Sequence, residues 1–415
     1  MSRVAVVGAG AVGLCAAWSL RQRGHHVVVL DGAPARGGAS WGNAGWVVPA
    51  LSSPVPAPGV PWYGVRSLVT PGAPFRMRPS LGLLPWLVAF ARNCTAEAHR
   101  AGTAATLALA LNAPNSFRDL AASGVECPLR KQGIHFVGTT RAAVEKELTL
   151  LNVLSEHGYD VPARIDDGDA TRAADAALSD EVVAGFHLGG DQHLDPRQLL
   201  AGLESWLAAR DVAVHRDRPV IGFTRRGAAV TSVLTSRSAE AVDAVIIAAG
   251  AWSASLCRKL GYRLPLQAGK GYSFSIALRR QPQRPLYLLE AKVAVTEMAG
   301  RTRFAGMMEL TGANTRLQPR RLAALERHAR RYLRDWATPQ NAWAGLRPMV
   351  PDGLPVIGAV PGTDNAFLVT GHAMLGITLA PATANAVADL LDGTDDPRIA
   401  PFTPARFSRR GPTMR

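Results

Sequence analysis

The first thirty residues place apolar runs on either side of a glycine-rich turn. Residues 3–7 and 26–31 are short apolar runs, residues 8–13 carry three glycines, and residues 14–23 are compatible with a helix. Strand, tight turn, helix and strand in this order make a βαβ unit with two parallel strands.

Later segments predict further strands of both kinds. The predicted strands are residues 131–137, 182–188, 212–215, 244–250 and 366–370, with antiparallel strands over 220–236 and 264–304. The predicted helices are residues 141–157, 320–336 and 377–391, most of 63–125, and a helix that begins at Pro196 with Asp195 as its N-cap. The pattern therefore predicts an α/β fold with a Rossmann-like parallel sheet and a second, antiparallel sheet.

Composition and charge narrow the class of protein. Of the 415 residues, 47% are apolar and 19% charged, as in a folded globular protein with two or three domains, end to end or interleaved. The net charge of +14 would attract anionic partners. The basic residues are spread out, apart from a tail with Arg406, Arg409, Arg410 and Arg415, and no nucleic-acid motif accompanies them. No nucleic-acid partner is therefore predicted.

Cysteine usage and hydropathy predict a cytoplasmic protein without a metal. Four scattered cysteines form no C-x-x-C pair and no cluster with histidine, so neither disulfides nor a metal site are indicated. No signal segment precedes the first strand. The longest apolar stretch, residues 81–91, is too short for the roughly 18–20 residues of a membrane span. It is a buried helix or an interfacial one, and peripheral contact with the inner face of a membrane stays open.

The glycine turn has the spacing of a dinucleotide site. Gly8 permits the turn, Gly10 lets the backbone approach a pyrophosphate, and Gly13 lets the helix pack closely on the strands. Phosphate would lie at the positive end of the helix. Asp31 follows Gly13 by 18 residues and is placed to bind an adenosine ribose. A structural turn and a polar strand end are the alternatives.

Two more glycine-rich segments carry candidate chemistry. Residues 36–49 include Ser40, Asn43 and two tryptophans, and cannot form a regular element. They either wrap a large cofactor with backbone N–H groups or form an ordinary loop. Residues 371–376 precede the last predicted helix, whose N-terminus would offer partial positive charge to an electron-rich ring.

Six motifs, in order along the chain, resemble those of the D-amino-acid oxidase-like family of FAD-dependent oxidoreductases, above all its bacterial D-amino-acid dehydrogenase branch. They are Gly8-x-Gly10-x-x-Gly13 with Asp31, Ser40-Trp-Gly-Asn43-Ala-Gly45, Ala248-Ala-Gly250-Ala-Trp-Ser253, Gly269-Lys-Gly-Tyr272-Ser, Gly345-Leu-Arg347-Pro with Asp352-Gly-Leu-Pro-Val-Ile-Gly358, and Gly371-His-Ala-Met-Leu-Gly376. Residues 51–130 match least, and substrate or partner differences would reside there.

The resemblance implies FAD bound non-covalently, because the C-terminal flavin-facing motifs lack the cysteine of covalently flavinylated relatives. Asp31 would bind the ribose, Val220 would lie near the adenine, and residues 371–377 would cover the pyrimidine edge of the flavin. The residues that the resemblance implies bind FAD are Gly8, Gly10, Ala11, Val12, Gly13, Asp31, Ser40, Asn43, Ala44, Gly45, Val220, Ala249, Gly250, Gly371, Met374, Leu375, Gly376 and Ile377.

The resemblance also implies two interleaved domains. A Rossmann-like FAD-binding domain would comprise residues 1–50, 140–180, 194–262 and 345–415. An α+β substrate domain built on an antiparallel sheet would comprise residues 51–139, 181–193 and 263–344.

Three residues are the catalytic candidates. Arg347 matches the family's carboxylate-binding arginine, and a guanidinium pairs with a carboxylate through two parallel hydrogen bonds. The alternative is an arginine that anchors its loop to an acid such as Asp352. Tyr272 would border the substrate or pack within the sheet. His372 would accept a proton, or be a structural hydrogen-bonding residue whose backbone contacts FAD. Lys270 is a further polar candidate.

The resemblance implies dehydrogenation of D-amino acids, with D-proline and hydroxy-D-proline as further candidates, by hydride transfer from the α-carbon to flavin N5. The electron acceptor would be a quinone, a dye or oxygen. Three alternatives stay open: a glycine or sarcosine oxidase that produces hydrogen peroxide, a nicotinamide-dependent dehydrogenase, and a flavin-bearing subunit without turnover of its own. The physiological amino acid and the oligomeric state do not follow from the sequence.

Overall fold

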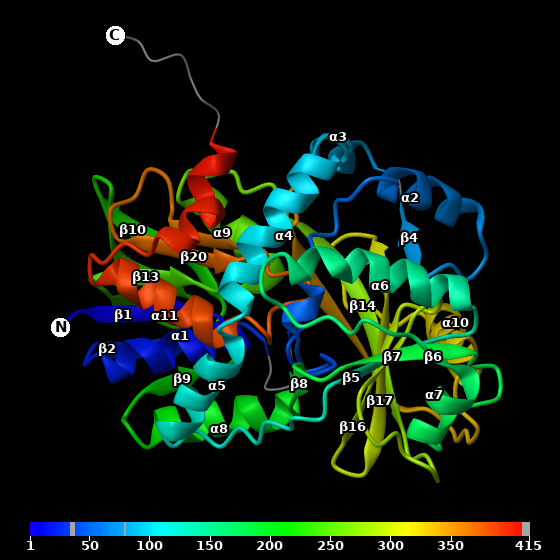
Figure 1. Cartoon of the computed structure of the whole chain (residues 1–415). Helices are drawn as coiled ribbons and strands as arrows, with labels where there is room; N and C mark the ends of the chain where they lie inside the picture. The colour runs from blue at the N-terminus through cyan, green and yellow to red at the C-terminus, as the bar shows by residue number, and fades with distance from the viewer. Residues whose placement is uncertain (34–37, 79, 409–415) are drawn as a thin grey trace.

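A computed structural model describes residues 1–33, 38–78 and 80–408. Three arginines of the basic tail, Arg409, Arg410 and Arg415, lie outside the described residues. The described helices are α1 (Ala11–Gln22), α2 (Val60–Val69), α3 (Leu84–Arg92), α4 (Ala96–Ala110), α5 (Ala113–Ala122), α6 (Arg141–Ser155), α7 (Gly168–Ala174), α8 (Pro196–Ala208), α9 (Ser253–Lys259), α10 (Pro319–Arg330) and α11 (Ala380–Leu391). Figure 1 shows two main sheets side by side, with helices packed around them.

The first main sheet is the Rossmann-like one. Its strands are β1 (Arg3–Val7), β2 (His26–Leu30), β9 (Ala213–His215), β13 (Ala244–Ile247), β19 (Val356–Ala359) and β20 (Ala366–Thr370). The order is β19-β20-β13-β1-β2-β9, and every pair is parallel except β19 with β20. Because β1 has a parallel neighbour on each side, the crevice beyond its carboxyl end is the usual ligand position in such sheets. The predicted βαβ unit is confirmed.

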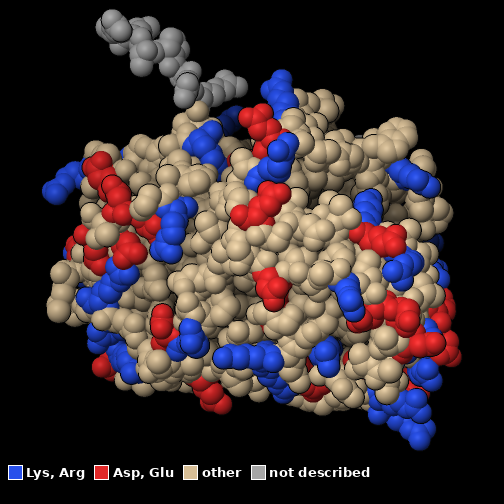
Figure 2. All heavy atoms as spheres, in the orientation of Figure 1, with Lys and Arg blue, Asp and Glu red and all other residues tan. Residues whose placement is uncertain are grey.

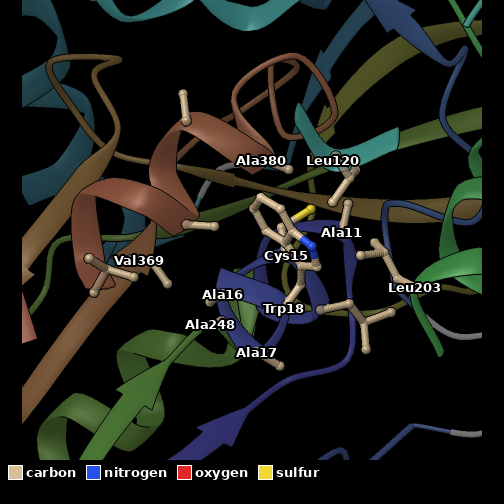
Figure 3. Close-up of a cluster of buried hydrophobic side chains, with 14 of the residues drawn as sticks. Ala11, Cys15, Ala16, Ala17, Trp18, Leu120, Leu203, Ala248, Val369 and Ala380 are labelled. Carbon is tan, nitrogen blue, oxygen red and sulfur yellow. The ribbon is translucent and has the colours of Figure 1, made fainter. Parts of the chain in front are cut away.

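Helix α1 is buried on nearly every side, which fixes its N-terminus at the end of β1. Its central residues, among them Cys15 and Trp18, are inaccessible to solvent. Figure 3 shows these side chains among Leu120, Leu203 and Ala380, which come from α5, α8 and α11. A helix that is apolar all round is stable only when it is packed on all sides.

The second main sheet is mostly antiparallel. Its strands are β18 (Gln340–Met349), β14 (Gln267–Ile276), β17 (Arg301–Leu310), β16 (Val293–Met298), β15 (Leu286–Leu288), β5 (Ile134–Gly138), β7 (Ala184–Leu188) and β6 (Asp166–Asp167) in spatial order, with β4 (Phe75–Met77) beside β17. The pairs β15–β5 and β17–β4 are parallel. The smaller sheets are β10 (Val220–Arg226), β11 (Ala229–Thr235) and β12 (Ala239–Ala241), and β3 (Trp46–Val47) with β8 (Gln192–His193).

Two segments lie with a different sheet from the one predicted. Residues 140–180 were assigned to the FAD-binding domain, but β6 pairs with β7 of the second sheet and α6 packs against β5 and β7. Val144 and Leu154 of α6 share a buried cluster with Phe136 of that sheet. Likewise residues 345–349 form the end of β18, the edge strand of the second sheet, because they pair with β14.

The apolar stretch 81–91 is only partly buried. Leu83 and Trp86 pack against Leu310 and Met349, whereas Leu81 is 91% exposed. Within the described residues no helix combines the length and the hydropathy that crossing a bilayer requires.

Candidate active site

The glycine turn lies against the end of β13 so closely that side chains are excluded. Gly8 has φ +116°, and a Cβ there would be 2.5 Å from the carbonyl oxygen of Ala248. A Cβ on Gly13 would overlap the carbonyl oxygen of Gly8. Helix α1 starts directly after the turn, without a side-chain cap and without an acidic residue in its first turn. Apart from the N–H of Ala11, which donates to Ser40 Oγ, the amide groups of its first turn have no side-chain acceptor among the described residues and can bind an anion such as a phosphate.

Asp31 lies beside this turn at the carboxyl end of β2. Its Oδ2 accepts the N–H of Ala9 at 2.5 Å, and its Oδ1 accepts the N–H of Ala33 at 2.6 Å. Each carboxylate oxygen can accept a further hydrogen bond. The half-buried carboxylate is thus held in place while retaining acceptor capacity for a ribose hydroxyl.

The loop 39–48 connects this turn with the second sheet. Ser40 Oγ accepts the N–H of Ala11 at 3.0 Å, at the start of α1. At the other end, Thr296 Oγ1 donates to the carbonyl of Ala44 at 2.9 Å, and Arg303 Nη1 donates to that of Asn43 at 3.0 Å. Arg303 and Thr296 were not among the predicted site residues. No local sequence signal marks them, because β17 also carries Arg301, Thr302 and Glu309, and β16 carries Glu297.

The loop 371–378 lies beside both the loop 39–48 and strand β18. Thr378 Oγ1 donates to the carbonyl of Trp46 at 3.0 Å and accepts the N–H of Val48 at 3.2 Å. The N–H of Ala373 donates to the carbonyl of Pro348 at 3.1 Å, one residue beyond Arg347. The two glycine-rich loops singled out in the sequence therefore meet next to the predicted arginine.

Strand β18 approaches the loop 39–48 so closely that glycine is needed on both sides. A Cβ on Gly42 would overlap the indole of Trp343, and one on Gly345 would lie 3.1 Å from the Cα of Ala39. The Nε1 of Trp343 is buried without a protein partner. A ligand with polar atoms would satisfy such a donor. Together with the tight turn at Gly8 and the start of α1, this orphan donor fits an extended dinucleotide such as FAD.

Arg347 presents its guanidinium beside Gly271, where a Cβ would overlap the Nη1 and Nη2 atoms. Nη1 donates to the carbonyl of Met307 at 2.8 Å. No carboxylate of the described residues lies within ion-pair distance of it. Asp352 instead pairs with Arg406 at 2.7 Å, which contradicts the alternative in which Asp352 anchors Arg347. Burial lowers the pKa of the Arg347 guanidinium to about 10, so it stays charged at neutral pH.

The carbonyl that holds Arg347 comes from a bulge in strand β17. Between Gly306 and Glu309 the register with β14 shifts, and Met307 adopts φ +62°. This left-handed conformation costs a non-glycine residue roughly 1–2 kcal/mol. The bulge turns the Met307 carbonyl toward the guanidinium, as bulges beside active sites commonly re-aim groups.

Tyr272 and Lys270 lie on the opposite face of the second sheet from Arg347. Successive residues of a strand alternate between faces, so Gly269 and Gly271 share the face of Arg347 whereas Lys270 and Tyr272 do not. The Tyr272 hydroxyl donates to Glu309 Oε2 at 2.8 Å, and Lys270 Nζ lies 3.4 Å from the same oxygen. Burial raises the pKa of the Tyr272 phenol. The geometry favours the packing alternative for Tyr272 over a place beside the substrate.

His372 is also engaged within the protein. Its side chain is buried, and its Nε2 lies 3.0 Å from Thr383 Oγ1 in α11. Burial lowers the pKa of the imidazole to about 4, so the ring is neutral at physiological pH. This arrangement favours the structural alternative for the side chain, while the His372 backbone lies within the loop 371–378.

The other predicted cofactor residues lie around the same crevice. Val220 begins β10 and packs on a cluster that contains Leu30, next to Asp31. Gly250 follows β13, and its carbonyl accepts the Thr370 hydroxyl at 3.0 Å. Ala249 packs partly buried on the same cluster as Val220. Met374 is 48% exposed, so its side chain turns outward from the loop 371–378.

Comparisons with known proteins cover almost the entire chain. A family model described as FAD dependent oxidoreductase (DAO) matches residues 3–390. A D-amino acid dehydrogenase of Cereibacter sphaeroides is 33% identical over 403 residues, which are 94% of this chain and 92% of that relative. A D-amino acid dehydrogenase of Rhizorhabdus wittichii is 33% identical over 94% of this chain and 96% of its own length.

Solved structures of similar fold are more distant in sequence. Glycine oxidase from Geobacillus kaustophilus has a TM-score of 0.77 at 21% identity, covering 98% of this chain and 100% of the other. L-proline dehydrogenase from P. horikoshii has a TM-score of 0.73 at 15% identity, covering 98% and 97%. At these identities the likeness establishes the fold.

Proposed function

The chain belongs to the DAO family of FAD-dependent oxidoreductases, and from this premise we propose that it dehydrogenates D-amino acids at the α-carbon. The observation that carries the proposal is Arg347, a charged guanidinium that has no acidic partner among the described residues and lies where the loops 39–48 and 371–378 meet. The names of the curated relatives support the D-amino acid as the substrate class.

We propose that FAD binds non-covalently along the crevice from the start of α1 to β18. Gly10 and the amide groups of α1 would receive the pyrophosphate, and Asp31 the ribose. Loops 39–48 and 371–378 would hold the ring system. When bound, FAD supplies an acceptor for the hydride that leaves the α-carbon.

The chain's own residues contribute binding and orientation. Arg347 would fix the substrate carboxylate through paired hydrogen bonds, with Met307 holding the guanidinium in place. Met308 and Met349 close over Gly269 beside it and keep this face apolar, which strengthens the ion pair by excluding water. Fixing one end of a small substrate removes much of the entropic barrier to reaction. No proton acceptor is required of His372 or Tyr272 when the amine binds in its neutral form.

The experiment that tests this role compares Arg347→Ala and Arg347→Lys with the wild type, using D-amino acids and an artificial electron acceptor. Arg347→Ala would remove charge-assisted hydrogen bonds to the substrate carboxylate that contribute about 2–3 kcal/mol. We expect a roughly 30- to 150-fold fall in kcat/KM, mostly because KM rises. Arg347→Lys should recover only part of it, because lysine lacks the planar fork. Unchanged kinetics in Arg347→Ala with FAD retained would contradict the proposal.

We further propose that the electrons pass to a quinone or a dye more readily than to oxygen, and that the enzyme contacts a membrane peripherally. The dehydrogenase names of the curated relatives support this choice of acceptor. Fast hydrogen peroxide formation in air without added acceptor would instead favour a glycine or sarcosine oxidase. Turnover of glycine and sarcosine in preference to D-alanine and D-proline would point the same way.

A further inference from the structure

Helix α2 presents large apolar side chains to solvent and a small polar one to the protein. Trp62 is 72% exposed, Val65 57% and Val69 81%, whereas Ser67 is the buried residue of this helix. An ordinary surface helix has the opposite arrangement, with its apolar stripe facing the core. The orientation of α2 is therefore costly in water unless something covers it.

The exposed apolar surface continues onto the start of α3. Leu81 is 91% exposed, Leu84 55% and Val88 42%. The name "apolar patch" is used here for eight residues: Trp62, Tyr63, Val65, Leu68, Val69, Leu81, Leu84 and Val88. They are half of the sixteen large apolar side chains that are exposed among the described residues, although they span fewer than thirty positions. A concentration of this kind marks an interaction surface.

The segment that carries the apolar patch has charges of one sign. Residues 32–96 contain no aspartate and no glutamate. Arg66, Arg76, Arg78 and Arg92 lie in the same segment and are exposed, and none of them takes part in an ion pair with the described residues. In the space-filling view, the upper right of the molecule over α2 is tan with scattered blue and no red (Figure 2).

We propose that the apolar patch docks onto the surface of a bilayer that contains anionic phospholipid. Trp and Tyr side chains beside aliphatic ones suit the boundary between headgroups and acyl chains, and the four arginines would bind lipid phosphates. A second copy of this chain is disfavoured, because a two-fold contact would bring each set of arginines against the same set.

The inner side of the same segment packs next to the candidate active site. Leu83 and Trp86 share a cluster with Met349 and with Met308, which contact the face of Gly269 that carries Arg347. Docking would thus place the active site close to the lipid surface. This inference deepens the membrane contact of the proposed function, and lipid binding is measured independently of turnover.

Vesicle flotation tests the docking directly. The full chain is mixed with vesicles of phosphatidylcholine alone, or of an equal mixture of phosphatidylcholine and phosphatidylglycerol. Flotation with the mixed vesicles is expected, with less than a tenth of that binding to phosphatidylcholine alone. The triple variant Trp62→Ser/Val69→Ser/Leu81→Ser should lower binding at least tenfold. The triple variant Arg66→Gln/Arg78→Gln/Arg92→Gln should lower it similarly and remove most of its dependence on salt.

Matched variants on other faces serve as controls. Leu150→Ser/Val183→Ser/Ile221→Ser removes three exposed apolar side chains, and Arg226→Gln/Arg237→Gln/Arg279→Gln removes three exposed charges. Both should float like the wild type. Turnover of D-amino acids with a soluble dye in the absence of vesicles is measured on every variant, so a failed reaction is told apart from failed docking.

Three results would overturn the docking proposal. The first is absence of flotation with the mixed vesicles, and the second is equal flotation of the wild type and the apolar triple variant. The third is a dimer, detected by light scattering, that the apolar triple variant converts to a monomer, since a second copy would then cover the apolar patch.

Discussion

Arg347 keeps its charge available because Asp352, the candidate acid in its sequence motif, pairs with Arg406. Arg347 is half-buried, and partial removal of an unpaired cation from water is unfavourable, so structures retain such an arrangement mostly at functional sites. The sequence motif led to Arg347, but whether its guanidinium was free depended on Asp352. That carboxylate pairs with Arg406, which is 54 residues away and unrelated to it by any spacing rule.

Tyr272 is predicted to matter for stability and little for substrate binding. Its hydroxyl donates to Glu309, which also lies 2.9 Å from Arg321 Nε. Tyr272→Phe would remove a hydrogen bond to a charged acceptor and should lower the free energy of unfolding by about 1.5–3 kcal/mol. KM for D-amino acids should stay within twofold of the wild type. A large rise in KM with unchanged stability would contradict this prediction and indicate that Tyr272 contacts the substrate.

Asp191 should make stability depend on pH. It is fully buried, and its Oδ1 accepts the Tyr159 hydroxyl at 2.6 Å. Burial raises the pKa of this carboxyl from 3.8 to about 7. The folded state therefore binds more protons than the unfolded state between these values, so this group lowers stability as pH rises through that window.

Asp191→Asn removes that ionisation while keeping an acceptor for the Tyr159 hydroxyl. Chemical denaturation between pH 4 and 8 should show a shallower fall in the free energy of unfolding for Asp191→Asn than for the wild type, by about 1–4 kcal/mol over the range. Parallel profiles for the two proteins would show that Asp191 does not titrate in this way.

At the scale of strands and loops, β14 is shaped around the arginine of its neighbour β18. Gly271→Ala would place a methyl group against the guanidinium, and the flexible arginine would move rather than the backbone. We expect a ten- to hundredfold loss in kcat/KM with FAD retained, because small displacements of a binding group are costly.

Gly222→Ala in strand β10 is the control for this substitution. A Cβ there would be 3.7 Å from Leu234 Cδ1, an ordinary contact, and the strand belongs to a different sheet from Arg347. Its kinetics should match the wild type. Equal kinetics for Gly271→Ala and the wild type would mean that the position of the Arg347 guanidinium is not critical.

Local elements could be predicted because local rules govern them. The turn needs glycine at positions 8 and 13 because the helix that follows packs directly against the strands, and the structure has this turn where the sequence placed it. The contacts of the loop 39–48 could not be predicted in the same way. Arg303 and Thr296 reach it only because β16 and β17 pair in a register that no short-range pattern specifies.

At the scale of the whole molecule, the chain passes several times from one main sheet to the other. Strand β18 belongs to the second sheet and ends at Met349, and β19, which begins seven residues later at Val356, belongs to the first. The sheet against which residues 140–180 pack could not be predicted from the sequence. The apolar pattern of a helix with buried Val144 and Leu154 is the same whichever sheet the helix covers.

The exposure of the segment 60–92 is likewise a property of the assembled fold. Its sequence predicted helices, and the stretch 81–91 was compatible with a buried or an interfacial position. The second sheet and the loop 371–378 offer packing only to the inner side, where Leu83 and Trp86 lie. The remaining apolar side chains are left at the surface.

The central claim is that this chain holds FAD with a substrate carboxylate at Arg347. The most direct measurement is the absorbance of the flavin-loaded protein mixed without oxygen with D-alanine, D-proline and their L-enantiomers. The account predicts bleaching by the D-enantiomers, with Arg347→Ala needing at least 30-fold more substrate for the same rate. A chain that takes up no flavin, or bound flavin that no D-amino acid reduces, would contradict it.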